Sequence, residues 1–524
     1  MTRLRWILTH PLEIKALPKM IPVIPLPYLK DLSYITIGEI LLILPLLFLV
    51  LQGYALSFVT PDLDKSGQVA SYAMYLTFLT ANKSNNLVSL ILGISFDRLI
   101  PLHQLCGMVA VVLGCFHTYA AFQFGGANLN GAEDSIHTSF GTDPNLIKFL
   151  GDGTNNLTGS LLVASLFASV VLSIVPLRRF AFQLWLYSHI IFAITAVVVS
   201  FLHDVTTVVF VMLWWALDLT IRYLLMAGWR NQAEADLELL VSAKDDRQIV
   251  QITFPKPQGF DYVPGQFVQV AIPAVSMFQF HPVSISSAPH EDKITLYFRG
   301  MGDWTNALVE LAKTKKQTLI MLEGPFGSLA IDLEDRNRYK TVLLVGGGIG
   351  NTVCESVGKA LLHQHEAGER SLTKLRYVWA VRKLAMVHDM PPLGGCRPNI
   401  PYAAGISTEE MDVPSIQSAA HDFVEIDVYS TRGEEEFLDR DEDLFRGDEN
   451  LFRVHKTRPD FDVILEEIKQ VAIEADESNV AVIACGPPGM VDVLREACRK
   501  HSSMVVGCAE KVVFFDLHTE RFEF

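Results

Sequence analysis

The chain has 524 residues, of which 50% are hydrophobic, and a formal net charge of −15 at pH 7. A chain of this length has room for about three domains. The negative charge, which no basic stripe interrupts, argues against nucleic acid as a partner. Apolar residues are concentrated before residue 230, so the sequence predicts a membrane half followed by a soluble half.

Cysteine usage and the first residues give two further expectations. The seven cysteines are odd in number, and none lies in a predicted outer loop, so we expect no disulfide framework and a reducing environment for the soluble half. Residues 1–34 contain prolines and basic residues but no long apolar run with a cleavage site. We therefore predict a cytosolic N-terminal segment and no signal peptide.

Residues 35–228 are predicted to form an all-α transmembrane bundle of six helices. Apolar segments of the length that a span needs lie at 35–59, 67–96, 99–124, 157–176, 180–203 and 205–227. Six spans bring both ends of the bundle to one face. Basic residues gather on that face, where Arg98, Arg178, Arg179 and Arg230 are opposed by only Lys65 and Lys148. The positive-inside rule then predicts cytosolic N- and C-termini.

Two pairs of histidines mark two of these segments. His103 and His117 lie in the third, and His189 and His203 in the fifth, with 14 residues between the members of each pair. Fourteen residues are just under four helical turns, so both rings of a pair project from one helix face, about 21 Å apart along the axis. Two such helices side by side offer a facing pair near each membrane surface, which is how a haem iron is held from both axial sides.

Histidine is otherwise scarce in this half. Residues 34–228 contain five histidines, and the fifth, His137, lies in a polar loop. Polar side chains at membrane depth cost roughly a few kcal/mol, so they persist mainly where a function holds them. We therefore predict two stacked haems, the inner one held by His103 and His189 and the outer one by His117 and His203.

The predicted outer loop, residues 125–153, is acidic, and a glycosylation sequon, Asn156-Leu157-Thr158, follows on the same side. An acidic mouth would gather cations. A loop that is merely solvated is the simpler interpretation of the same composition.

After Gly228 the pattern changes to short alternating runs typical of antiparallel strands, which predicts a small β-barrel over residues 233–333. The run His281-Pro282-Val283-Ser284-Ile285-Ser286-Ser287 places small hydroxyl residues on a strand, where a flat ring can approach the backbone. A helix then opens over the segment that contains Arg299, Gly302 and Thr305. A glycine-rich helix start beside an arginine suits a pyrophosphate.

Residues 338–524 are predicted to form an α/β nucleotide-binding domain. A buried strand leads into Gly346-Gly347-Gly348-Ile349-Gly350-Asn351-Thr352 and a helix, the context of a dinucleotide-binding turn, although Asn351 replaces the third glycine. The next strand ends in Arg382, where a cation can pair with a 2′-phosphate, and this favours NADPH over NADH.

Two insertions are predicted in this domain, at about 385–420 and 433–456. From Glu434 to Glu449 there are nine acidic residues against two arginines. Such a composition cannot bury a core, so we expect a solvated or disordered loop.

Several motifs occur together in one order along the chain. They are the paired histidines, His281-Pro-Val-Ser-Ile-Ser-Ser, Gly324-Pro325-Phe-Gly327, Gly346-Gly-Gly-Ile-Gly350, Cys485-Gly486-Pro487-Pro and the closing Glu520-Arg-Phe-Glu-Phe524. From about residue 35 to the last residue, this combination resembles the ferric-chelate reductase and NADPH oxidase superfamily of transmembrane di-haem flavocytochromes. The resemblance implies a haem bundle followed by FAD and nucleotide domains of the ferredoxin-NADP reductase type.

The resemblance also implies roles for individual residues. The barrel would bind FAD, with the His281–Ser287 strand along the flavin. NADPH would be held by Gly324 and Pro325, by the glycine turn through Thr352, and by the Cys485–Pro487 segment. Phe524 would stack on the isoalloxazine and move for nicotinamide to enter, and Cys485 would lie near the hydride path.

The implied activity is electron transfer from cytosolic NADPH through FAD to the inner and then the outer haem, with the plasma membrane as the expected location. Ferric-chelate reductases of the family keep a spacing of 14 in both histidine pairs, whereas the oxidases usually shorten the second. The oxidases also carry a histidine one turn after the outer ligand, where this chain has Ala121. With no calcium-binding hands before the first helix, these features favour reduction of ferric chelates, and also of copper, over reduction of dioxygen.

Two alternatives come from other classes of protein. One is a non-enzymatic haem-binding channel or scaffold, which the intact flavin and dinucleotide motifs argue against. The other is a flavin reductase of the soluble type fused to an inert anchor, which the paired histidines argue against.

Overall fold

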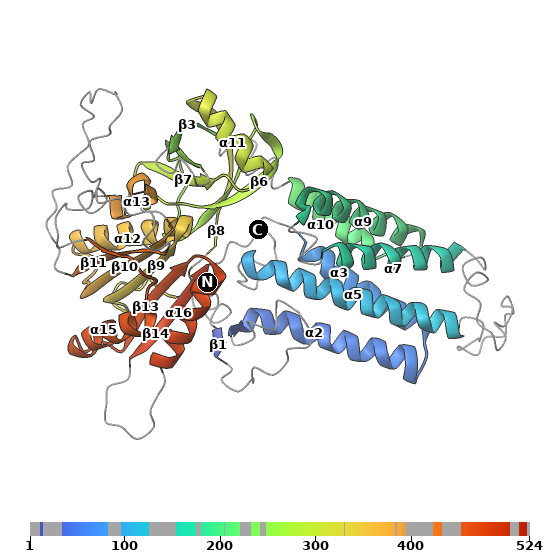
Figure 1. The fold of residues 1–524 in the computed structure, drawn as a ribbon. Helices are drawn as coiled ribbons and strands as arrows, with labels where there is room; N and C mark the ends of the chain where they lie inside the picture. The colour runs from blue at the N-terminus through green and yellow to red at the C-terminus, as the bar shows by residue number, and fades with distance from the viewer. Residues whose placement is uncertain are drawn as a thin grey trace, which may run out of the picture. The chain divides into compact units, whose positions relative to one another are not determined.

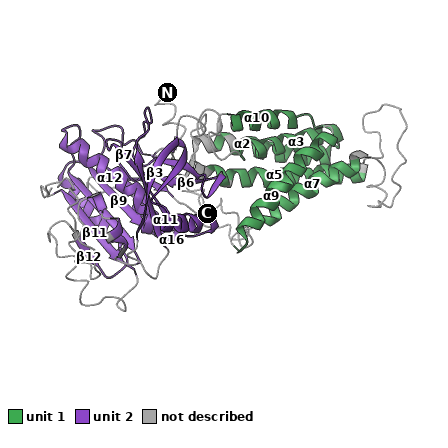
Figure 2. Cartoon of the chain, turned by 90° about the horizontal axis from the view of Figure 1, so that it is seen from above, with its two compact units in different colours: residues 1–222 green, residues 223–524 purple. Residues whose placement is uncertain are grey.

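The fold is described from a computed structural model. The residues described are 11–13, 34–81, 96–124, 154–173, 180–203, 205–220, 232–240, 248–327, 329, 331–382, 385–390, 392–394, 423–431, 452–502 and 513–520. The chain divides into two compact units, residues 1–222 and residues 223–524 (Figure 2). Each unit is considered by itself.

The first unit is helical, apart from a short antiparallel pair of strands, β1 (Pro11–Glu13) and β2 (Tyr34–Thr36). Within its described residues, a helix lies in each of the six apolar segments. These helices are α2 (Ile37–Tyr54), which continues as the π-helix η2 (Ala55–Val59), α3 (Leu63–Leu79), α5 (Phe96–Phe124), α7 (Thr154–Leu172), α9 (Phe182–Leu202) and α10 (Val208–Thr220).

Two stretches of these helices are long and apolar enough to cross a membrane, Leu102–Gln123 and Phe182–Leu202. Shorter apolar helices cover Ile43–Val59, Asn156–Leu172 and Val208–Leu217. Many large apolar side chains face outward from the bundle, among them Leu47 at 55% exposure and Phe210 at 63%. Contiguous exposed apolar surface of this kind is what a membrane covers.

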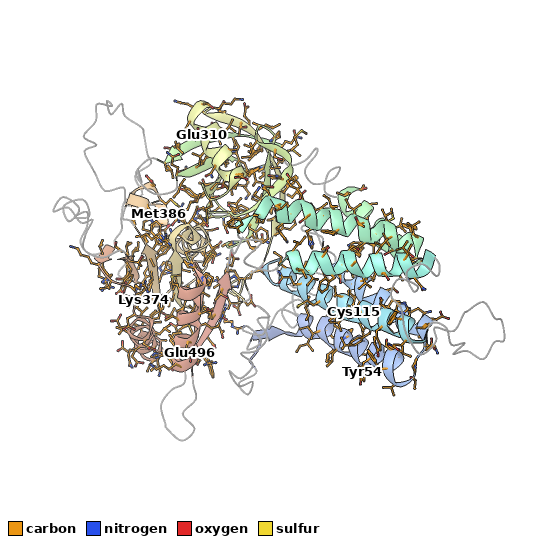
Figure 3. The ribbon with its side chains drawn as sticks, turned by 45° about the vertical axis from the view of Figure 1, so that its right-hand side comes forward. Tyr54, Cys115, Glu310, Lys374, Met386 and Glu496 are labelled. Carbon is orange, nitrogen blue, oxygen red and sulfur yellow. The ribbon has the colours of Figure 1, made fainter. Side chains whose placement is uncertain are left out.

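The helices of this unit pack in adjacent pairs. Helix α3 lies along α5, α7 lies along α9, and α5 also contacts α7 (Figure 1). Small side chains such as Ala73, Ala110 and Ala196 are fully buried between them, which lets the backbones approach closely. Figure 3 shows the side chains along these helices, including Tyr54 of α2 and Cys115 of α5.

The second unit begins with an antiparallel sheet of six strands in the order β6-β5-β8-β3-β4-β7. The strands are β3 (Gln232–Leu240), β4 (Ile249–Pro255), β5 (Phe267–Ile272), β6 (Ser276–Ser284), β7 (Lys293–Arg299) and β8 (Gln317–Phe326). The predicted antiparallel strands are therefore confirmed. The edge strands β6 and β7 are linked just beyond β6, where the Ser286 amide donates to the Thr295 carbonyl at 3.0 Å. The closed barrel stays a prediction.

A parallel sheet of six strands follows, in the order β12-β11-β10-β9-β13-β14. Its strands are β9 (Thr341–Gly347), β10 (Lys374–Val381), β11 (Val424–Ser430), β12 (Phe452–His455), β13 (Asn479–Cys485) and β14 (Phe514–Glu520). One face packs on α12 (Asn351–Glu366), and the other packs on α15 (Phe461–Glu474) and α16 (Pro488–His501). This three-layer arrangement places the ends of β9, β10 and β13 at one edge of the sheet.

The structure describes short elements at the ends of the two predicted insertions, whose bounds stay predictions. Residues inside the predicted insertion 385–420 form α13 (Ala385–Asp389) and the short 3₁₀ helix η5 (Pro392–Gly394), and Val387 and Met390 belong to the core. The predicted insertion 433–456 ends in β12, which pairs with β11 in parallel. Residues 395–422 and 432–451 lie outside the described residues, as does the predicted outer loop from 125 to 153.

Candidate functional site

The histidines of the first unit come together as pairs across two helices. His103 of α5 and His189 of α9 face each other, with ring centres 6.3 Å apart and ring planes at 79°. His117 of α5 and His203, which caps the end of α9, are close enough to interact electrostatically. The two helices therefore present their histidines in matching order, one pair at each level.

Each histidine of the inner pair is anchored through its Nδ1 atom. His103 Nδ1 donates to the Thr77 carbonyl at 2.9 Å. His189 Nδ1 lies 3.3 Å from the Ser173 hydroxyl oxygen. That hydroxyl donates to the Ser169 carbonyl at 2.7 Å and accepts from Trp185 Nε1 at 3.0 Å, so toward His189 it acts as an acceptor.

The outer pair is anchored in the same way, by hydroxyl groups. Ser66 Oγ lies 2.9 Å from His117 Nδ1, and it donates its own proton to the Leu63 carbonyl at 2.9 Å. Thr158 Oγ1 lies 3.1 Å from His203 Nδ1. An Nδ1–H that donates leaves Nε2 as the lone-pair nitrogen of the ring, which is the nitrogen a metal binds.

The spacing of the inner pair fits a metal between the rings. With metal–imidazole bonds of about 2 Å, as in zinc sites, and roughly 1 Å from nitrogen to ring centre, ligated rings stand about 6 Å apart. The observed 6.3 Å agrees with that separation. A two-histidine axial set leaves the remaining positions of the metal to the four nitrogens of a porphyrin.

Two glycines clear the space beside the outer rings. A Cβ atom on Gly67 would lie 3.1 Å from His117 Cε1 and 3.4 Å from its Nε2. A Cβ atom on Gly159 would lie 2.8 Å from His203 Cε1 and 3.1 Å from its Nε2. A side chain at either position would meet the imidazole ring, so glycine lets each ring lie close against the neighbouring helix.

In the second unit, the predicted flavin strand lies beside the predicted pyrophosphate turn. The rings of His281 and Trp304 stack with centres 4.0 Å apart, which joins the end of β6 to the start of α11 (Asp303–Thr314). Within the described residues, the buried side-chain atoms Ser284 Oγ, Gln269 Oε1 and Trp304 Nε1 have no hydrogen-bond partner. Buried polar atoms are normally paired, so these are candidate contacts to a polar ligand.

Ser287, at the end of the predicted flavin segment, forms hydrogen bonds within the protein. Ser287 is buried, its hydroxyl accepts from the Thr295 amide at 3.1 Å, and its carbonyl accepts from Tyr262 at 3.1 Å and from Ser356 at 2.8 Å. Burial raises the pKa of Tyr262 to about 12, so its hydroxyl remains a donor. Through Ser356 of α12, Ser287 connects the antiparallel sheet to the nucleotide domain.

The turn before α11 is fixed by Thr305. Its hydroxyl accepts from the Met301 and Gly302 amides at 2.9 and 3.0 Å. Gly302 caps the helix and Arg299 ends β7 directly before it. The three residues predicted for a pyrophosphate therefore share one turn.

Two side chains of β10 hold the glycine turn of the nucleotide domain through hydrogen bonds. Trp379 of β10 donates its indole proton to the Gly348 carbonyl at 2.9 Å. Asn351 accepts from the Tyr377 hydroxyl at 2.5 Å and packs against Gly346, which explains an asparagine where a third glycine was expected. Gly348 has φ +56°, a conformation that glycine adopts without strain.

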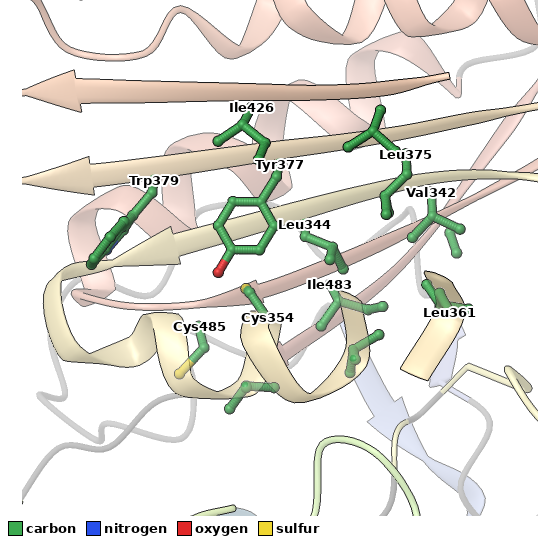
Figure 4. Close-up of a cluster of buried hydrophobic side chains, with 14 of the residues drawn as sticks. Val342, Leu344, Cys354, Leu361, Leu375, Tyr377, Trp379, Ile426, Ile483 and Cys485 are labelled. Carbon is green, nitrogen blue, oxygen red and sulfur yellow. The ribbon is translucent and has the colours of Figure 1, made fainter. Parts of the chain in front are cut away.

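The Cys485 segment meets this turn backbone to backbone. A Cβ atom on Gly350 would lie 3.0 Å from Cys485 Sγ, and one on Gly347 would lie 3.1 Å from Gly486 Cα and 2.5 Å from Pro487 Cδ. Figure 4 shows Cys485 at this end of the sheet with Trp379, Tyr377 and Cys354. Burial, and then the nearby charge of Glu520, raise the pKa of the Cys485 thiol well above its usual value, so the thiol stays neutral.

The remaining predicted nucleotide residues lie in different places. Gly324 and Pro325, joined by a cis peptide bond, are on β8 of the antiparallel sheet rather than in the α/β domain. Arg382 is exposed directly after β10, at the same sheet edge as the glycine turn, and Thr352 donates to the Ile349 carbonyl at 3.2 Å. Phe524 lies outside the described residues.

The sequence reasoning missed the groups that surround the histidines. Ser66 and Gly67 on α3 correspond to Thr158 and Gly159 on α7, so the same hydroxyl-glycine pair stands at each outer histidine. Its repetition in two apolar helices was a usable signal. From the sequence, Thr158 is interpreted only as part of a sequon at the outer side, and the structure places it in the first turns of α7.

Comparisons with known families agree with this arrangement. Residues 66–200 match the family described as "Ferric reductase like transmembrane component", residues 235–330 match an "FAD-binding domain", and residues 406–499 match a "Ferric reductase NAD binding domain". The matches define a membrane flavoprotein with a ferric-reductase-like transmembrane domain and domains for FAD and a nicotinamide nucleotide. The chain belongs to the superfamily of ferric reductases and NADPH oxidases. Its cofactors are FAD, NADPH and haem.

Among curated proteins, the chain is similar to dual oxidase 2 of Rattus norvegicus, with 24% identity over 83% of this chain and 30% of that protein. It is 26% identical to NADPH oxidase 1 of the same species, over 48% of this chain and 42% of that protein. The chain thus spans less than half of either relative. A ferredoxin NADP+ reductase from Neisseria gonorrhoeae covers 55% of this chain and 98% of its own, with 13% identity and a TM-score of 0.35, too low to carry an argument.

Proposed function

We propose that this protein carries electrons across a membrane, from NADPH on the cytosolic side to an acceptor on the opposite face, most directly ferric iron in a chelate. When bound, FAD and two haems supply the exchange between the two-electron donor and single-electron transfer. The proposal includes six membrane spans, cytosolic termini and location in the plasma membrane.

One observation carries this proposal: four histidines on two helices form two facing pairs, and each ring is anchored through Nδ1. The acceptors at His103, His117 and His189 have no proton left to give, so these rings donate from Nδ1, and the neutral form of each ring then has its lone pair on Nε2. The paired positions of the histidines and the hydrogen bonds at Nδ1 therefore both suit binding of a metal through Nε2. Gly67 and Gly159 let the His117 and His203 rings lie close against the neighbouring helices.

The chain's own residues have separable tasks in this proposal. Ser284, Gln269 and Trp304 would hydrogen-bond FAD, and the turn at Gly302 and Thr305 would hold its phosphates. The glycine turn would receive the NADPH phosphates, with Arg382 on the 2′-phosphate. Cys485 would be an uncharged wall near the nicotinamide, since its buried thiol is neutral.

The acceptor distinguishes two candidate functions. Ferric reduction is supported by the equal spacing of 14 in both histidine pairs and by Ala121 one turn after His117. Dioxygen reduction is supported by the curated relatives, which are named as oxidases. With both axial positions taken by histidine, either acceptor would be reduced at the haem edge, and copper(II) would be accepted as well.

The test uses purified protein that contains FAD and haem, supplied with NADPH and a ferric chelate under air and under nitrogen. Formation of iron(II) without oxygen, unaffected by superoxide dismutase, is the result expected for a ferric reductase. Iron reduction that requires oxygen and disappears with the dismutase would identify superoxide as the product. A protein that binds neither haem nor FAD would refute both functions.

A further inference from the structure

The haem-facing histidines and the groups that anchor them belong to different helices. His103 and His117 lie on α5 and are anchored from α3, by Thr77 and Ser66. His189 lies on α9 and is anchored by Ser173, the residue that follows α7. His203 caps α9 and is anchored by Thr158 of α7. Because α3 packs along α5 and α7 along α9, the same anchor-and-ligand unit occurs twice in the chain.

The anchors differ in one chemical respect. His103 donates to a backbone carbonyl, which remains whatever side chain stands at position 77. His117, His189 and His203 contact side-chain hydroxyls, which a single substitution can remove. His189 also interacts with the Ser169 backbone, and His103 Nδ1 also lies 3.4 Å from the Thr80 hydroxyl. Ser66 and Ser173 each send their proton to a helix carbonyl, at 2.9 and 2.7 Å, so their lone pairs are directed to the histidines.

A hydrogen bond accepted from Nδ1–H makes the imidazole a more basic ligand. A more basic axial ligand stabilises the oxidised iron and lowers the reduction potential, since axial ligands and their hydrogen bonds are principal controls on that potential. Loss of the acceptor would weaken this effect, free the ring to rotate, and allow the other tautomer.

We propose that Ser66, Thr158 and Ser173 are positioning residues that fix the tautomers of their histidines and set the potentials of the two haems. Ser66 and Thr158 act on the outer haem, and Ser173 acts on the inner one. The inference rests on the proposed function, because it requires the paired histidines to be axial ligands.

The test compares Ser66→Ala and Thr158→Val with wild type, using the full-length protein with FAD and haem bound. Haem content is measured first, and the two midpoint potentials are then read from haem absorbance in a redox titration. We expect the outer haem to become easier to reduce, with a ferrous-to-ferric ratio about tenfold higher at fixed potential, which is about 59 mV for one electron. Ser173→Ala should shift the other midpoint instead.

Matched controls separate this effect from loss of a hydroxyl in general. Ser71→Ala on α3 removes a hydroxyl that donates to the Gln68 carbonyl, and Thr195→Val on α9 removes one that donates to the Ile191 carbonyl. Neither should move a midpoint. Thr158→Ser keeps the hydroxyl and should restore the wild-type value.

Loss of the outer haem from Ser66→Ala or Thr158→Val, with both controls intact, would also support positioning. Unchanged midpoints in variants that keep both haems would overturn the inference and leave the proposed function standing. Wild-type protein without haem would refute the proposed function itself. Flavin content, measured in every sample, reports the folding of the second unit, and retention of the haem that the substitution does not contact reports the folding of the helical bundle.

Discussion

His103 and His189 face each other across two helices with ring centres 6.3 Å apart, and each ring is hydrogen-bonded through Nδ1. Two rings at this distance, with Nε2 left as the lone-pair nitrogen, fit a metal bound between them. The proposed electron path depends on this pair and on its outer counterpart, His117 and His203.

Replacing an outer histidine should remove one haem and leave the other. In His203→Ala we expect about half of the wild-type haem absorbance per flavin, because His103 and His189 still form a complete axial pair. Flavin reduction by NADPH should continue, since its residues lie in the other unit. Loss of all haem, or none, would contradict the assignment of separate inner and outer sites.

Gly159→Ala should stabilise helix α7 but weaken haem binding at the outer site. Alanine favours a helix over glycine by about 1 kcal/mol, yet the added Cβ atom would lie 2.8 Å from His203 Cε1. We expect lost or weakened outer haem in a protein that folds normally. Gly107→Ala on α5 is the control, because its Cβ atom would meet only ordinary contacts, the closer at 3.6 Å. Equal haem content in both variants would rule out a role for Gly159.

The hydrogen bond from Trp379 to the glycine turn should support NADPH binding. Trp379→Phe removes the donor to the Gly348 carbonyl, and we expect KM for NADPH to rise about tenfold, equivalent to about 1.4 kcal/mol. Tyr339→Phe is the matched control, because it removes a hydrogen bond to Asp516 near the start of β9, away from the turn. If steady-state kinetics gave the same KM in both variants, Trp379 would have only a structural role.

Acid should destabilise the second unit through a histidine pair. His290 and His363 stack with ring centres 3.9 Å apart, and Glu291, Lys359 and Glu366 are nearby. Burial, and then positive charge on His363, lower the pKa of His290 below 6.5. As pH falls through 6.5 the unfolded state takes up a proton that the folded state resists, so stability is lost below that pH.

The measurement for this pair is thermal release of flavin, followed by fluorescence between pH 7.5 and about 5.5. His290→Phe keeps a ring against His363 but cannot be protonated at position 290. We expect its melting temperature to fall less across this range than that of the wild-type protein. An equal fall in both proteins would show that other groups cause the acid sensitivity.

The sequence predicted the elements that have a strong period or a distinctive motif. Each of these elements can be predicted from the spacing of residues within its own segment. They are strands β3, β4, β5, β9 and β13, the helix after the glycine turn, and the two matching levels of histidines. The anchors Ser66 and Thr158 cannot be predicted in this way, because they depend on the register between two helices. That register is set by packing, which a single segment does not encode.

Two further features of the nucleotide domain could not be predicted for a similar reason. Val387 lies in the short helix α13 and Met390 directly follows it, between breaks in the sequence pattern that predict an insertion, yet both side chains are buried. Asn351 departed from the expected glycine, and only the contact with Tyr377 from the neighbouring strand explains it. In both cases the deciding partner comes from a distant part of the chain.

The most direct test of the proposed path encloses an impermeant ferric chelate in lipid vesicles that contain the FAD- and haem-loaded protein. NADPH is added outside, and iron(II) formed inside is measured for protein molecules oriented with the nucleotide domain outward. The account predicts iron(II) inside the vesicles for wild type and for Ser71→Ala, and none above background for His203→Ala. Two results would contradict electron transfer through the paired histidines. One is the same amount of internal iron(II) from His203→Ala as from wild type. The other is that wild type reduces a ferric chelate added outside the vesicles but none inside.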